Sequence, residues 1–175
     1  VHHRLDRDTS GIVLFTKSRR VNAAITDAFS RHRVVKVYQA LTVTGSRDKR
    51  KKQWTVRNTI GRVASKARRT RYGAVRSGGE PAETSFRIVE ELAGGIWIEA
   101  IPRTGRTHQI RVHLSEYGLP ILGDDLYGGD RFTTRLMLHA GRLTFPHPLT
   151  GIEASVTSPL PEDFLRCVQK LRGTS

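Results

Sequence analysis

Apolar residues in the first quarter of the chain mark one helix and two extended segments. A short uninterrupted apolar run, Ile12–Phe15, predicts a strand buried on both faces. A helix is predicted over residues 19–31, because Ser18 can cap it and apolar side chains recur on one helical face at positions 21, 24, 25, 28 and 29. Residues 34–44 are rich in β-branched side chains and predict a strand of the main sheet.

The middle of the chain is less regular until a hairpin pattern begins. A weak strand is predicted over residues 54–57, and the stretch 77–81 is typical of a turn. Residues 83–92 and 96–101 are joined by Gly94–Gly95, and the second of these segments alternates apolar with other side chains. This pattern predicts a β-hairpin.

A second helix is predicted over residues 107–117, ended by Gly118 and Pro120. Arg111 follows the apolar Ile110 by about 100° around that helix. It therefore either reaches into a cleft from the edge of the buried face or points into solvent. Further strands are predicted around residues 143–145 and 153–157, and a final helix starts near Leu160 with an apolar face at positions 164, 165, 168 and 171.

Composition places the chain among single-domain proteins of ordinary size. It has 175 residues, and 37% of them are hydrophobic. No apolar run is long enough to span a membrane, and the start does not resemble a secretory signal. The single cysteine, Cys167, excludes an internal disulfide and fits a reducing compartment. We therefore expect a cytoplasmic protein without a membrane partner.

The charge points to a polyanionic partner. The formal net charge is +14, and residues 44–76 hold twelve Lys and Arg residues against one acidic residue, Asp48. A basic tract of this kind is typical of nucleic-acid binding. It is also what a solvated, disordered loop looks like, and the two interpretations are compatible because such a loop can order on RNA.

Several kinds of chemistry lack their usual motifs. His108 and His113 are five residues apart, which does not place them on one helical face, and HExxH, GxSxG and a mononucleotide P-loop are all missing from the sequence. A charged loop, residues 3–11, precedes the first apolar run and carries Asp6. From the residues alone this loop is either a carboxylate site or a solvated turn with paired charges. Tyr38, inside a predicted strand, is either a core residue or part of a site.

Several segments resemble the RluA-type RNA pseudouridine synthases, and they follow one another in the order seen in that family. The first is similar to the family signature HRLDxxTSG, and the second to its KxYxA segment. The matching stretches are His3–Gly11 (HRLDRDTSG), Lys36–Ala40 (KVYQA), Thr104–His113 (TGRTHQIRVH), Pro120–Asp124 (PILGD), Leu126–Gly128 (LYG) and Leu138–Ala140 (LHA).

The resemblance implies an α+β fold, with a mixed, mainly antiparallel sheet flanked by helices and an active-site cleft across the sheet. It implies isomerisation of uridine in structured RNA to pseudouridine without a cofactor or metal, with rRNA the first expected substrate and tRNA the second. It also implies that residues 1–175 form the catalytic domain without its N-terminal strands, acting as a monomer, with residues 45–82 as a basic RNA-contacting insert. The alternative is a non-catalytic RNA-binding or ribosome-assembly module on the same scaffold.

The resemblance also implies roles for particular residues. Asp6 would be the essential carboxylate, Arg111 would hold it ionised and oriented, and Tyr38 would stack on the base and take part in proton transfer. Arg4 would fill the gap left by the flipped nucleotide. Further RNA contacts are expected from basic side chains of the cleft and of the insert, namely Arg106, His108, Lys51, Lys52, Arg68 and Arg69.

Overall fold

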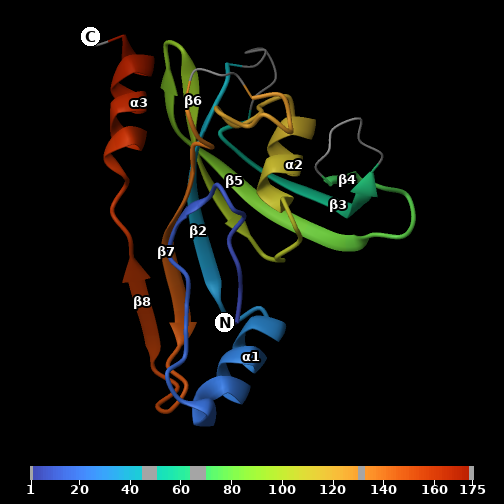
Figure 1. Ribbon diagram of the computed structural model, residues 1–175, viewed down its shortest axis with the longest axis vertical. Coiled ribbons are helices and arrows are strands. Elements are labelled where there is room, and N and C mark those ends of the chain that lie inside the picture. The colour runs from blue at the N-terminus through green and yellow to red at the C-terminus, as the bar shows by residue number, and fades with distance from the viewer. Residues whose placement is uncertain (1, 45–50, 64–69, 130–132, 174–175) are drawn as a thin grey trace.

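A twisted sheet forms the centre of the molecule in the computed structural model, which describes residues 2–44, 51–63, 70–129 and 133–173 (Figure 1). Within these ranges the strand order is β1-β7-β2-β6-β5-β3-β4, and β8 pairs with β7. Only the β1–β7 pair is parallel. The predicted mixed, mainly antiparallel sheet is therefore confirmed. The strands are β1 (Ser10–Gly11), β2 (Val35–Thr42), β3 (Gln53–Val63), β4 (Arg71–Ala74), β5 (Glu80–Leu92), β6 (Gly95–Pro102), β7 (Leu138–Pro146) and β8 (Glu153–Thr157).

Helices pack on both faces of this sheet. On β6, Trp97 makes an edge-to-face contact with Phe164 of α3 (Glu162–Arg172). Phe86 of β5, which is paired with Ala100 of β6, contacts His113 of α2 (Gln109–Glu116) instead. Positions 97 and 100 of one strand point to opposite faces, so α2 and α3 cover opposite sides of the sheet, as Figure 1 shows.

The predicted first helix is present with a shorter regular part. A 3₁₀ turn, η1 (Arg19–Val21), leads into α1 (Asn22–Ser30), and the Ser18 side chain accepts a hydrogen bond from the Arg20 backbone N–H at 3.3 Å. Helix α1 packs through Ile25 and Ala28 against a small core with apolar residues of β7. The predicted cap and helix are thereby confirmed.

The predicted hairpin and the second helix are confirmed as β5–β6 and α2. The final helix is confirmed with one correction on its apolar face. Leu165 was predicted to be buried, but it is 44% exposed, and Cys167 is buried in its place. The difference arises because α3 packs on the sheet through Phe164, Val168 and Leu171, and the turn of the helix puts Leu165 outside this contact.

The predicted buried strand at Ile12–Phe15 is wrong. Strand β1 ends at Gly11, residues 12–15 have no regular structure, and Phe15 is 64% exposed. Only Ile12 and Leu14 pack against the small core beneath α1. The backbone N–H of Ile12 bonds to Ala140 O, whereas that of Leu14 bonds to the His3 ring. The segment therefore leaves the sheet instead of extending it.

The basic segment 45–82 contributes strands to the main sheet. The weak strand predicted at 54–57 is part of the longer β3, which pairs with β5 on one side and with the short β4 on the other. Arg68 and Arg69 lie outside the described residues. Contact of this segment with RNA stays a prediction. No described helix is both long and apolar enough to cross a membrane.

Candidate active site

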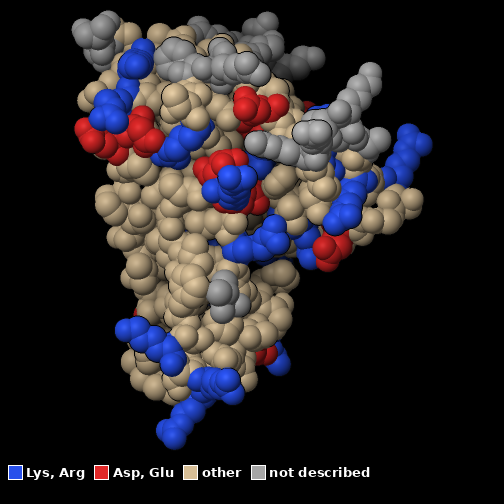
Figure 2. All heavy atoms as spheres, viewed as in Figure 1, with Lys and Arg blue, Asp and Glu red and all other residues tan. Residues whose placement is uncertain are grey.

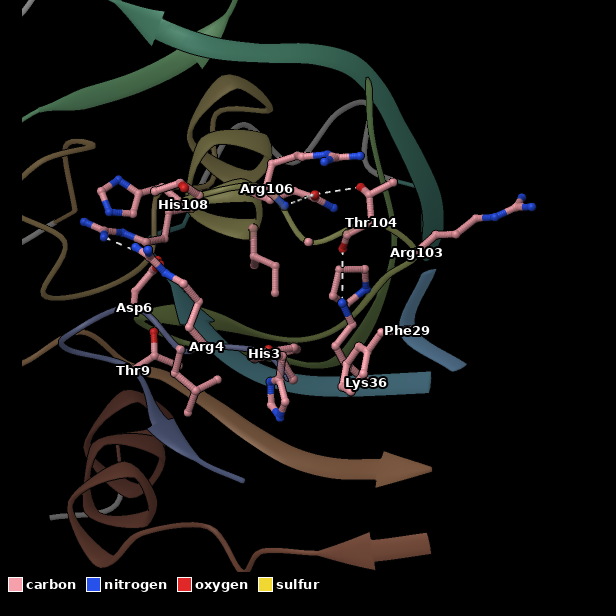
Figure 3. A pocket seen from close by; sticks show the side chains of 18 of the residues that line it. His3, Arg4, Asp6, Thr9, Phe29, Lys36, Arg103, Thr104, Arg106 and His108 are labelled. Atoms are coloured by element: carbon pink, nitrogen blue, oxygen red, sulfur yellow. Dashed lines mark hydrogen bonds and ion pairs between the residues drawn. The ribbon is translucent and has the colours of Figure 1, made fainter. Parts of the chain in front are cut away.

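A cleft of about 800 Å³ opens between the loop that precedes β1, the end of α1, strand β2 and the segment from β6 into α2. Three predicted catalytic side chains line it: Asp6, Tyr38 and Arg111. Figure 3 shows Asp6 at one end of the cleft and Lys36 at the other, with Arg4 running toward Asp6. Residues far apart in the sequence therefore meet in one cavity.

The loop that carries Asp6 is held at both ends. At its start, His3 accepts a hydrogen bond at Nε2 from the Leu14 backbone N–H (2.9 Å) and stacks on Phe29 at 5.1 Å between ring centroids. At its end, Gly11 has φ +116°, and a Cβ there would lie 2.3 Å from Ala140 O. Only glycine fits this close approach of β1 to β7. The carboxylate of Asp6 is thus presented by a fixed loop.

Arg111 is fixed by a second carboxylate. Its Nε and Nη2 donate to Asp124 at 2.8 Å each, and its Nη1 lies 3.6 Å from Asp6 Oδ2. Arg111 is 8% exposed and lines the cleft, so the solvent-facing alternative is wrong. Burial alone would lower the pKa of Arg111, but hydrogen bonds and the charges of Asp124 and Asp6 raise it above its usual value.

Asp124 and Tyr127 are parts of this arrangement to which the sequence assigned no role. Asp124 is 1% exposed, and its Oδ1 also accepts from the backbone N–H groups of Leu126 and Tyr127. The Tyr127 ring lies under the Arg111 guanidinium, 5.0 Å from its centroid, as in a cation–π contact. Both residues belong to family-like segments, Pro120–Asp124 and Leu126–Gly128, which was the available signal.

Tyr38 is 9% exposed and contributes both to the core and to the cleft. Tyr38 is therefore a core residue that also lines the cleft, so both positions considered for it from the sequence apply. Burial, with the nearby charge of Asp6, raises the pKa of Tyr38 to about 12. The phenol is accordingly protonated at neutral pH and is available as a hydrogen-bond donor.

His108 is neutral and held in an unusual conformation. It precedes α2 with φ +58°, in the left-handed region that few residues other than glycine adopt. The Tyr127 hydroxyl accepts from the Tyr72 backbone N–H at 3.0 Å, which leaves its own proton for Nδ1 of His108 at 2.9 Å. Burial lowers the pKa of His108 despite the opposing charge of Asp6. The remaining ring proton is therefore on Nε2.

The predicted RNA-contacting residues occupy different positions. Arg4 is exposed in the cleft. The Arg106 guanidinium already donates to Glu80 Oε1, at 2.6 Å from its Nη1, and to the Pro81 carbonyl. Lys51 and Lys52 are exposed and do not line the cleft. Figure 2 shows basic side chains gathered across the middle of the viewed face and on the side where β3 and β4 lie.

Within the described ranges, no three His, Cys, Asp or Glu side chains are grouped to hold a metal ion. The cleft instead offers one carboxylate, a protonated phenol and fixed cations. Fold and site together define an α+β protein with a basic, carboxylate-centred cleft.

Comparison with known proteins identifies the family. Residues 1–116 match the family model for RNA pseudouridylate synthase, so the chain belongs to this family, as predicted from the sequence. It is 38% identical over 181 residues to ribosomal large subunit pseudouridine synthase C of Escherichia coli K12, covering 98% of this chain and 56% of that protein. It is 36% identical over 173 residues to an uncharacterized RNA pseudouridine synthase of Chloroflexus aurantiacus, covering 97% and 52%.

The fold agrees with a solved relative. Human RNA pseudouridylate synthase domain containing 1 superposes with a TM-score of 0.78 at 28% identity, covering 99% of this chain and 80% of that one. The predicted pseudouridine synthase fold is thus confirmed. The chain spans about half the length of the curated relatives it matches.

Proposed function

We propose that this protein isomerises uridine to pseudouridine in RNA, with large-subunit rRNA as the substrate and Asp6 as the essential carboxylate. The observation that carries the proposal is the placement of Asp6 3.6 Å from Arg111 in a cleft that Tyr38 also lines. Membership of the RNA pseudouridylate synthase family and similarity to proteins named for the ribosomal large subunit support it.

In the reaction the bond between N1 of uracil and C1′ of ribose breaks, the uracil turns, and C5 bonds to C1′. The C5 proton leaves and N1 gains one, so the product is an isomer of the substrate and no redox partner is needed. Asp6 serves either by adding to C1′ or by taking a proton from the sugar in a glycal route. Both require an ionised carboxylate beside the ribose, and Arg111 lies 3.6 Å from Asp6 Oδ2, where it pairs with that carboxylate.

The target uridine must leave its stack to enter the cleft, at a cost of a few kcal/mol. Arg4 is proposed to occupy the vacated space, since a guanidinium plane stacks on bases and also binds phosphate. His108, Arg106, Lys51, Lys52, Arg68 and Arg69 are proposed to contact the RNA around the target. We further propose that the protein acts as a monomer in the cytoplasm, which light scattering of the purified protein and localisation of a tagged chain would test.

The direct test is pseudouridine formation on transcribed bacterial large-subunit rRNA by the wild type and by Asp6→Asn. We expect turnover to fall by at least about 10³-fold, or roughly 4 kcal/mol of barrier, while RNA affinity changes little. Activity with and without EDTA should be equal. A variant that forms pseudouridine at nearly the wild-type rate would contradict the role of Asp6.

A non-catalytic RNA-binding or ribosome-assembly role is the alternative. RNA that carries 5-fluorouridine separates the two, because an enzyme that attacks the base or its sugar is expected to retain an adduct on the modified RNA. RNA binding with neither adduct nor pseudouridine would favour the binding module. The same pair of assays on a chain extended to the length of the relatives tests whether this segment is sufficient.

A further inference from the structure

Lys36 has surroundings that neither the fold nor the carboxylate chemistry explains. It lies on β2 two residues before Tyr38, on the same face of the strand, and lines the cleft at the end opposite to Asp6 (Figure 3). Its ammonium donates to the Thr104 carbonyl at 3.3 Å, the one acceptor that the described residues offer it. An ammonium has three N–H donors, so two remain for a ligand.

The charge of Lys36 is not compensated by the protein. In the described part of the chain no carboxylate forms an ion pair with it. Burial, with the positive charge of Arg106, lowers its pKa to about 8. A partly buried lysine without an anionic partner is costly, and such costs are found where a ligand completes the site.

The wall around the ammonium leaves it accessible from the cleft. Gly105 contributes no side chain there, and a Cβ at that position would lie 3.5 Å from the ammonium nitrogen. The nearby His3 ring is kept neutral, because burial and the charge of Lys36 both lower its pKa. Lys36 therefore keeps two N–H donors for a ligand at this end of the cleft, whereas Arg106 already binds Glu80.

We propose that Lys36 and the Thr104–Gly105 turn form an anion subsite that holds one RNA phosphodiester beside the target nucleotide. Lys36 and Tyr38 are two residues apart on a strand, or about 7 Å. A phosphate bound at Lys36 therefore belongs to the nucleotide whose base reaches Tyr38 or to its immediate neighbour. The subsite contributes binding energy that holds the RNA strand in the cleft. This inference rests on the proposed function, because it assumes that RNA enters the cleft.

The test compares Lys36→Met with Lys170→Met. Methionine is an unbranched side chain only one atom shorter than lysine and carries no charge. Lys170 is an exposed lysine of α3, on the opposite side of the sheet. Affinity for transcribed large-subunit rRNA is measured across a range of salt concentrations. We expect Lys36→Met to bind about 10-fold more weakly, with a salt slope smaller by about one unit, and Lys170→Met to behave as the wild type.

Two further readouts separate this role from a structural one. Lys36→Met should unfold at a temperature no lower than the wild type, because it removes a partly buried charge. At saturating RNA, kcat for pseudouridine formation should stay within about 3-fold, while KM rises about 10-fold. A salt slope equal to that of the wild type would overturn the proposal, whether or not the unfolding temperature falls.

The remaining outcomes distinguish this proposal from the proposed function. Wild-type protein that forms pseudouridine while Lys36→Met binds RNA equally well overturns only the subsite. Wild-type protein that does not bind RNA overturns both. If inorganic phosphate at fixed ionic strength weakens RNA binding only when Lys36 is present, and the salt slopes of the two proteins are equal, the subsite binds free phosphate and the RNA contact is wrong.

Discussion

Arg111 gives its best hydrogen bonds to Asp124, not to Asp6. Two 2.8 Å bonds join it to Asp124, a carboxylate with no exposed side-chain surface, whereas Asp6 lies 3.6 Å from the remaining terminal nitrogen. A bidentate carboxylate fixes the plane of a guanidinium. Asp124 thus acts as a positioning residue, which sets the direction from which Arg111 approaches Asp6.

We expect Asp124→Asn to destabilise the protein by about 3 kcal/mol. The change leaves a buried guanidinium without its bidentate charged partner, with only Asp6 at 3.6 Å, which is costly in a desolvated site. Urea unfolding measures the effect. Glu162→Gln is the matched control, because it breaks the Glu162–Arg166 pair on the surface, with side chains 83% and 58% exposed. That control should change stability by no more than about 0.5 kcal/mol. Equal losses of stability in the two variants would show that the buried Arg111–Asp124 pair stabilises the protein no more than an exposed ion pair does.

Arg111→Lys tests geometry with the charge retained. A lysine carries one nitrogen and cannot bind both oxygens of Asp124 while facing Asp6. We expect kcat for pseudouridine formation to fall by about 10²-fold with RNA affinity within about 3-fold of the wild type. Single-turnover kinetics at saturating RNA provide the measurement. Retention of full turnover would mean that positive charge alone suffices beside Asp6.

Tyr38→Phe tests the hydroxyl group separately from the aromatic ring. The pKa of Tyr38 is raised to about 12, so the hydroxyl stays protonated through the neutral range. We expect the variant to lose about 10²-fold in kcat, the lower end of what one proton-transferring group contributes, and to keep KM because the stacking ring remains. The wild-type rate should show no ionisation of Tyr38 between pH 7 and pH 10. A rise in rate with an apparent pKa in that interval, absent from Tyr38→Phe, would contradict the assignment.

Local patterns were sufficient for elements whose apolar face is set by their own sequence. The capped helix after Ser18 and the β5–β6 hairpin follow from spacing and turn residues alone. The strand predicted at Ile12–Phe15 was wrong because an apolar run does not show which other segment of the chain packs on it. In the fold the chain leaves β7 after Gly11, and α1 covers only part of the run.

The site was predictable only in part for a related reason. Asp6 and Arg111 carry a motif-level signal, and the fold brings them together. Asp124 lies in a glycine-rich loop without periodicity, so its burial could not be inferred from neighbouring residues. Lys36 opens the family-like segment Lys36–Ala40, but that segment does not show its missing counter-charge, which is a property of the walls around it.

His113 is a buried neutral imidazole that links α2 to the sheet. It is fully buried, and its Nδ1 and Nε2 lie 2.9 Å from the Thr84 hydroxyl and from Asn58 Oδ1. The Thr84 oxygen accepts from Gln109, so its own proton is free for Nδ1, and Nε2 then donates to Asn58. The neutral ring satisfies both partners. Burial lowers the pKa of His113 to about 4.

This pKa predicts a loss of stability in mild acid. Unfolding returns His113 to a pKa near 6.5, so between that value and about 4 the unfolded chain binds a proton that the folded one does not. The contribution of the neutral ring is complete above about pH 6.5 and falls as the pH drops toward 4.

We expect wild-type protein to lose about 2 kcal/mol more than His113→Gln between pH 7 and pH 4.5, since each pKa unit corresponds to about 1.4 kcal/mol. Urea unfolding of both proteins measures this difference. His3, His108 and His139 have lowered pKa values too, but they are common to both proteins and cancel. Parallel pH profiles would show that His113 is protonated equally in the folded and unfolded states.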